Sequence, residues 1–195
     1  MYAYLRGKFT HKSPATVHLE TNGIGFEIHI SLQTYELIRP KEEGILYVHQ
    51  LIREDAHQLY GFAEPSEKEV FLHLLSVSGV GAATARVMLS SLSSAELIRT
   101  ITSGNEAGLE KIKGIGKKTA QRIVLELRDK MAKISTDQQN SVLLMHNTLE
   151  QEALIAMTAL GIAKNAAEVA IKKAIQAGGD NQKLETLIKS ALKCL

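Results

Sequence analysis

Residues 74–88 read LLSVSGVGAATARVM, and residues 109–123 repeat the pattern as LEKIKGIGKKTAQRI. Each stretch has an apolar helix end, a Gly-apolar-Gly turn and then the start of a second helix. A helix N-terminus presents backbone N–H groups without partners and a partial positive charge, so it can hold a phosphate. Glycine at both turn positions tolerates positive φ and lets another backbone approach closely. Two such turns in tandem make DNA the first partner to consider.

A single Gly-x-Gly between two helices is weak evidence, because helix C-caps and tight turns between helices also select glycine. Two copies that agree at eight or more positions favour a repeated functional unit over a plain structural turn. The repeat resembles the helix-hairpin-helix motif of DNA-binding proteins, used as a pair.

The net charge of +2 is unevenly distributed along the chain. Residues 109–133 hold eight basic and three acidic side chains, whereas residues 1–62 hold six basic and seven acidic ones. Phosphate contact needs cations, and they are concentrated on the second repeat. A solvated helix face remains the alternative for Lys130 and Lys133.

Composition limits the class of protein. The 195 residues are 45% hydrophobic and 23% charged, as in folded proteins with one to three domains. No stretch approaches the roughly 18 apolar residues of a membrane span, and the first residues lack the pattern of a secretion signal. Cys194 is the only cysteine, so an intramolecular disulfide is excluded. We therefore expect a cytoplasmic protein with no membrane contact.

The first domain, residues 1–63, is predicted to be a β-barrel. It contains five short apolar runs, and residues 26–30 alternate between apolar and polar as in a half-buried strand. Asn22-Gly23 between two such runs is a strong hairpin signal. Five strands favour a five-stranded OB-fold, although the pattern alone does not separate it from an SH3-like barrel.

The rest of the chain is predicted to be helical. Residues 64–132 form the tandem helix-hairpin-helix domain, residues 133–147 a flexible linker, and residues 148–195 a three-helix domain suited to binding a partner. The polar linker is interrupted by the apolar residues 142–145, which are a candidate docking element or helix start. No aromatic residue follows Phe71, so base stacking is not available to the helical region, which must contact the DNA backbone.

The chain as a whole resembles the RuvA family of bacterial Holliday-junction-binding proteins. The resemblance covers the whole chain in order, with the family's spacing. It rests on Gly25–Ile28, Arg53–Ala56, Leu59–Phe62, Ser78–Gly81, Gly114–Ala120, Glu152–Ala153 and Ala159–Gly161.

The resemblance implies an OB-fold, a tandem helix-hairpin-helix domain and a mobile three-helix domain. It implies structure-specific, sequence-independent binding of four-way junctions, held open and square for branch migration in recombination, DNA repair and the SOS response. The implied partners are the junction, the hexameric AAA+ motor RuvB bound by residues 148–195, and a resolvase as a further candidate. The implied assembly is a homotetramer, with an octamer on DNA left open. No cofactor is implied.

The resemblance and the repeat also assign the DNA contacts. Those residues are Ser78, Gly79, Val80, Gly81, Arg86, Gly114, Ile115, Gly116, Lys117, Lys118 and Arg122. One departure from the family stands in the first repeat, where Ala82 and Ala83 occupy positions that commonly include a lysine. The first hairpin is therefore expected to depend mainly on its backbone amides.

Glu54 and Asp55 match the family's acidic pin, which projects at the centre of the junction. On the residues alone these carboxylates mean little, because Asp is a routine turn residue. With the resemblance, they are expected to repel phosphates at the crossing point and to discourage binding of ordinary duplex.

Two other functions are alternatives to DNA-junction binding. A helix-hairpin-helix glycosylase would use Lys118 or Asp129, but it needs a pocket for a flipped base, which this aromatic-free region does not offer. The chain has no phosphate loop for ATP, no metal-ligand spacing among its histidines, and no histidine beside Ser78 or Cys194. We therefore predict a non-catalytic, metal-free subunit. A scaffold whose hairpins bind protein is the third possibility, and a steep salt dependence of DNA binding would argue against it.

Overall fold

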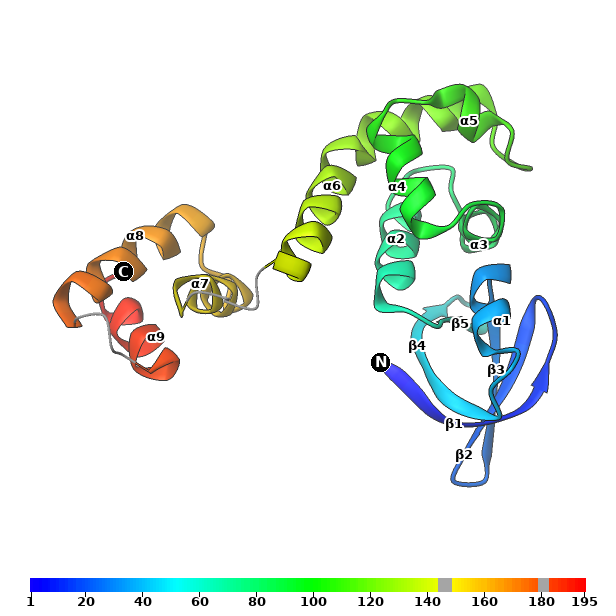
Figure 1. The fold of residues 1–195 in the computed structure, drawn as a ribbon, viewed down its shortest axis with the longest axis horizontal. Coiled ribbons are helices and arrows are strands. Elements are labelled where there is room, and N and C mark those ends of the chain that lie inside the picture. The colour runs from blue at the N-terminus through cyan, green and yellow to red at the C-terminus, as the bar shows by residue number, and fades with distance from the viewer. Residues whose placement is uncertain (144–148, 179–182) are drawn as a thin grey trace. The chain divides into compact units, whose positions relative to one another are not determined.

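The computed structural model describes residues 1–143, 149–178 and 183–195 (Figure 1). The chain divides into two compact units, Met1–Asp137 and Gln138–Leu195. The first unit has two hydrophobic cores, one inside a barrel and one among helices, and the second unit has a core of its own. The predicted domains 1–63 and 64–132 thus fall within one compact unit.

Five strands form a closed barrel in the order β1-β2-β3-β5-β4. β3 and β5 pair in parallel, and the other neighbours are antiparallel. This topology is OB-like, as predicted, and it decides against the SH3-like alternative. The strands are β1 (Tyr4–Lys12), β2 (Thr16–Thr21), β3 (Ile24–Ile30), β4 (Glu43–Ile52) and β5 (His57–Phe62).

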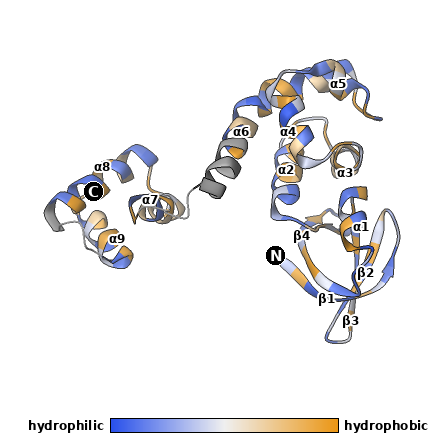
Figure 2. Ribbon diagram, viewed as in Figure 1, coloured by the Kyte–Doolittle hydropathy of each residue, from blue (hydrophilic) through white to orange (hydrophobic). Residues whose placement is uncertain are grey.

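The barrel core follows from the alternation of apolar and polar residues, which Figure 2 shows along the strands. Val17 and Leu19 of β2 are fully buried, as is Ile28 of β3. The predicted hairpin between β2 and β3 is confirmed. Asn22 has φ of 50° and Gly23 has φ of 80°, and two positive φ values in a two-residue loop define the turn that Asn-Gly favours.

A short helix, α1 (Leu32–Ile38), follows β3 and was not predicted from the sequence. Its N-cap is Ser31, whose Oγ accepts a hydrogen bond from the Thr34 amide at 3.0 Å. α1 lies between the strands and α3 (Figure 1), and the Leu32 amide donates to Ser90 Oγ at 3.1 Å. The barrel and the helices that follow it are therefore joined through α1.

The helical part of the first unit carries both repeats. Its elements are α2 (Pro65–Leu75), α3 (Ala82–Ser91), α4 (Ser94–Thr102), α5 (Glu106–Glu110) and α6 (Lys117–Leu143). α4 begins with a capping box, in which Ser93 Oγ accepts from the Glu96 amide and Glu96 accepts from the Ser93 amide. Leu74, Met88, Leu97 and Ile123 are fully buried in one shared core.

The predicted linker differs from the structure. α6 continues to Leu143, so residues 133–143 are helical rather than irregular. Buried apolar side chains extend past the predicted boundary, from Leu127 and Met131 to Ile134. Residues 144–148 lie outside the described residues, and so does part of the candidate docking element.

The second unit contains the three helices expected near the C-terminus, namely α7 (Leu149–Ala159), α8 (Lys164–Gly178) and α9 (Leu184–Lys193). Their core is built mainly from alanine, with Met157, Ile171 and Leu187 as its larger members. Gly161, at φ of 88°, ends α7 in the left-handed conformation that favours glycine. Across the described ranges, no helix combines the length and apolar character that a bilayer crossing requires.

Candidate nucleic-acid interface

The two repeats fold into turns with the same geometry. Gly79 has φ of 93° and Gly114 has φ of 92°, so each first glycine takes a conformation that other residues rarely adopt. Three backbone hydrogen bonds recur at an offset of thirty-five residues, with N···O distances that agree within 0.1 Å. They are Val77→Leu74 and Ile112→Leu109 (3.1 and 3.0 Å), Val80→Val77 and Ile115→Ile112 (3.0 and 3.1 Å), and Ala85→Gly81 and Ala120→Gly116 (both 2.9 Å).

The apolar residue between the glycines anchors each turn. Val80 and Ile115 are both 5% exposed, and their side chains belong to the helical core. Their amides already donate to Val77 and Ile112. Val80 and Ile115 are predicted to contact DNA, and the structure shows that their side chains and amides already hold the turn in place.

The backbone N–H groups without partners belong to the residues that follow the second glycine of each turn. Gly81 is the N-cap of α3 and offers no side chain to cover the amides that follow it. α6 begins in the same way, at Lys117 after Gly116. Among the described residues, the first amides of both helices have no hydrogen-bond acceptor. Each turn thus presents a helix N-terminus whose first amides have no partner, which suits an anion, although Ala82 of α3 is itself buried whereas Lys117 of α6 is exposed.

Neither the backbone conformation nor the packing of the chain requires glycine at the second glycine of each turn. Gly81 has φ of −86°, and Gly116 is also outside the positive-φ set, so only the first glycine of each pair needs left-handed freedom. A Cβ added at Gly81 or Gly116 would meet no atom of the chain within 4 Å. The space in front of these amides is open, as close approach by a ligand backbone requires.

The charged residues of the predicted site divide into two groups. Lys117 and Lys118 are exposed in the first turn of α6, and neither forms an ion pair within the described residues. Arg122 Nη1 instead donates to the Ser78 carbonyl at 3.0 Å, which ties the second hairpin to the turn of the first. Arg86 Nη1 donates to the Ala15 carbonyl at 2.9 Å, which ties α3 to the barrel.

The two candidate cation contacts can be ranked by mutation. Lys118→Ala is expected to lower affinity for a four-way junction by about tenfold and to reduce the salt slope of binding by about one. Arg86→Ala is expected to cost less affinity, because its guanidinium is held by Ala15. Fluorescence anisotropy over a salt series measures both, with Lys133→Ala on the same helix as control. A larger loss for Arg86→Ala would contradict the ranking.

Glu54 and Asp55, the predicted acidic pin, lie at the tip of the β4–β5 hairpin. His57 pairs with Ile52, and the Arg53 amide donates to the Ala56 carbonyl at 2.9 Å to close the turn. Both carboxylates are exposed, and neither forms an ion pair with any described residue. The hairpin therefore carries at its end two carboxylates that no ion pair within the described residues neutralises.

The glycosylase alternative does not fit this geometry. Lys118 and Asp129 lie on the same helix, α6, eleven residues apart. At about 1.5 Å per residue their backbones are roughly 16 Å apart along the axis, so the two side chains do not form a joint site. Within the described ranges, no three His, Cys, Asp or Glu side chains are grouped to hold a metal ion.

An OB-like barrel followed by two matching hairpins with uncovered helix N-termini defines a tandem helix-hairpin-helix DNA-binding protein. Comparison with known proteins agrees. A family model described as RuvA N terminal domain matches residues 1–61, and one described as SAM-like Helix-hairpin-helix tandem matches residues 71–129.

Similar proteins extend along the whole chain. The protein named Holliday junction branch migration complex subunit RuvA in Flavobacterium psychrophilum is 44% identical over 195 residues, covering 100% of both chains. Proteins of the same name in Cytophaga hutchinsonii and Bacteroides fragilis are each 42% identical, and cover 99% and 100% of both chains. The chain belongs to the RuvA family.

Proposed function

We propose that this chain binds four-way DNA junctions by their structure rather than their sequence, as the non-catalytic DNA-binding subunit of a branch-migration complex. The open space in front of Gly81 and Gly116, beside uncovered helix amides, supports the proposal most directly. Backbone amides contact phosphate oxygens and read no base edges, so such binding is indifferent to sequence. A protein on a moving junction needs binding that does not depend on base sequence, because the sequence at the crossing point changes as the junction migrates.

The same argument extends to assembly. Each chain offers two hairpins, and a four-way junction has four equivalent arms. A fourfold homotetramer gives every arm the same pair of hairpins and places four acidic pins around the crossing point. The carboxylates repel the phosphates there and oppose folding of the junction.

The C-terminal unit is proposed to recruit the motor. Its three helices have a core of their own, built mainly from small residues, and the sequence holds no phosphate loop for ATP. The energy for strand movement must then come from a partner, proposed to be the hexameric motor RuvB, with a resolvase as a further partner. We propose that the complex acts on the chromosome in the bacterial cytoplasm.

The division of labour can be tested with a labelled junction that releases separate duplexes when the branch point migrates. We expect products only when the full chain, the RuvB motor and ATP are present together. The chain alone, with magnesium and ATP, is expected to leave the junction intact. Products from the chain alone, or equal rates from the motor without the chain, would contradict the proposal.

A further inference from the structure

A buried carboxylate joins the barrel to the hairpins and has no role in phosphate binding. Glu67 of α2 is 4% exposed. Its Oε1 accepts a hydrogen bond from Ser31 Oγ, and its Oε2 accepts one from Thr34 Oγ1 at 2.6 Å. Burial raises the pKa of Glu67, although the two hydroxyl donors act against that rise. An apolar side chain would avoid this desolvation, so the carboxylate calls for another explanation.

The hydroxyl groups extend the contact to a third segment. Thr34 Oγ1 also accepts from the Ala63 amide at 2.9 Å, and Ala63 connects β5 to α2. Each hydroxyl has a single hydrogen, and both hydrogens are donated to Glu67. The network therefore fixes α1, the end of β5 and the first turn of α2 together. We call Ser31, Thr34, Ala63 and Glu67 the polar node.

A second set of contacts attaches α3 to the same side of the barrel. The Leu32 amide donates to Ser90 Oγ, and Ser90 Oγ donates to the Arg86 carbonyl at 2.8 Å. The Arg86 guanidinium donates to Ala15. Because α2 and α3 are the two helices of the first hairpin, both of its arms are bonded to the barrel.

The polar node also lies at one end of the strand that carries the acidic pin. β5 begins at His57, directly after the pin hairpin, and ends at Phe62, next to Ala63. Any rotation of α2 about the β5–α2 connection would move the pin relative to the hairpin turns. β5 and α2 also meet in an apolar contact, between the rings of Phe62 and Phe71, whose centroids are 4.9 Å apart. This contact holds β5 and α2 together, but unlike the hydrogen bonds it does not fix their relative orientation.

We propose that Glu67 is a positioning residue for junction recognition: through Ser31, Thr34 and Ala63 it fixes the hairpins relative to the acidic pin. The inference rests on the proposed function. Preference for a junction over a duplex is a difference between two affinities. A pin that moves freely repels both substrates to a similar extent, whereas a fixed pin discriminates between them.

The test compares Kd for a four-way junction and for a linear duplex at matched salt, using Glu67→Leu and Thr34→Val. Both variants are expected to keep duplex affinity within about twofold and to lose about three- to tenfold of the junction preference. Glu67→Gln, which keeps one acceptor oxygen, is expected to lose less. Glu69→Gln, on the exposed side of the same helix, removes the same charge and is expected to change nothing.

Thermal unfolding shows which variants are folded. If the variants at the polar node do not fold, Ser90→Ala decides, since it breaks the α3 contact and is expected to lower the junction preference as well. The inference would be overturned if folded variants kept the parental ratio of junction affinity to duplex affinity. A loss of both affinities by the same factor leaves that ratio unchanged and would overturn it too. A parent without junction preference would instead refute the proposed function.

Discussion

Gly81→Val and Gly116→Val, made together, are expected to leave the chain folded and to lower its affinity for a four-way junction by at least about 100-fold. Each hydrogen bond from an amide to a charged phosphate contributes about 1.5–3 kcal/mol, and two turns are blocked at once. Neither position requires positive φ, and a Cβ at either position would meet no atom of the chain within 4 Å. Replacing a glycine N-cap with valine is expected to cost about 1 kcal/mol of stability at most.

Fluorescence anisotropy gives the affinity, and thermal unfolding checks the fold. Gly25→Val is the matched control, because Gly25 also has open space and no positive φ but lies in β3 of the barrel. Gly79 and Gly114 are less suitable targets, since their φ values near +90° make any side chain there a source of strain. A folded Gly81/Gly116 variant that binds the junction like the parent would refute the amide contacts.

Glu54→Gln with Asp55→Asn is expected to raise affinity for linear duplex by about tenfold while changing junction affinity much less. Unit charges 4 Å apart in water interact by about 1 kcal/mol, and two of them are removed from each chain. The amides keep the size of the side chains and the shape of the turn. The junction preference therefore narrows because the competing substrate binds better.

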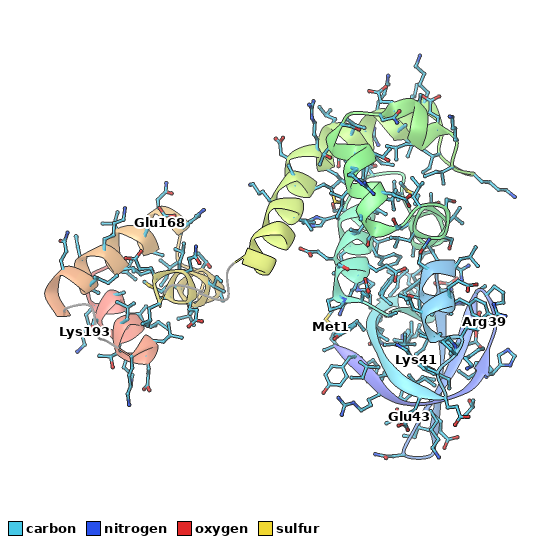
Figure 3. All side chains as sticks on the ribbon, in the orientation of Figure 1. Met1, Arg39, Lys41, Glu43, Glu168 and Lys193 are labelled. Carbon is cyan, nitrogen blue, oxygen red and sulfur yellow. The ribbon has the colours of Figure 1, made fainter. Side chains whose placement is uncertain are left out.

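A competition gel shift measures this preference directly. Glu42→Gln with Glu43→Gln is the matched control: these residues are also an exposed acidic pair, at the other end of β4, where Figure 3 labels Glu43. If the pin variant and this control both keep the parental selectivity, the pin has no role in discrimination. If selectivity changed equally in the pin variant and in the Glu42/Glu43 control, the cause would be net charge and not the position of the pin.

Local patterns predicted most of the fold. Short apolar runs located the five strands, with alternation in residues 26–30, and Asn22-Gly23 located one hairpin, because these signals depend on neighbours in sequence. α1 was missed because only Thr34 and Ile38 of its seven residues are buried, so it has too little apolar periodicity to detect. The polar composition of residues 133–143 predicted a linker, whereas α6 continues through them to Leu143, because composition alone does not separate a polar helix from a loop.

The sequence predicted the position of the candidate site but not the internal contacts of its residues. The repeat located both turns, and the structure places their glycines and lysines at the surface. It did not show that Val80 and Ile115 donate their amides internally. Nor did it show that Arg86 and Arg122 bind carbonyls 71 and 44 residues away in sequence. A side chain's distant partner depends on the assembled fold, so no local pattern reveals that these arginines join parts of the protein.

The most direct measurement is the affinity of the unmodified chain for a four-way junction and for a linear duplex with the same arm sequences, over a range of salt. A second junction with permuted sequence completes the comparison. The account predicts that both junctions bind equally, at least about tenfold more tightly than the duplex, with affinity falling steeply as salt rises. Equal binding of duplex and junction, a preference for one sequence, or no response to salt would contradict it.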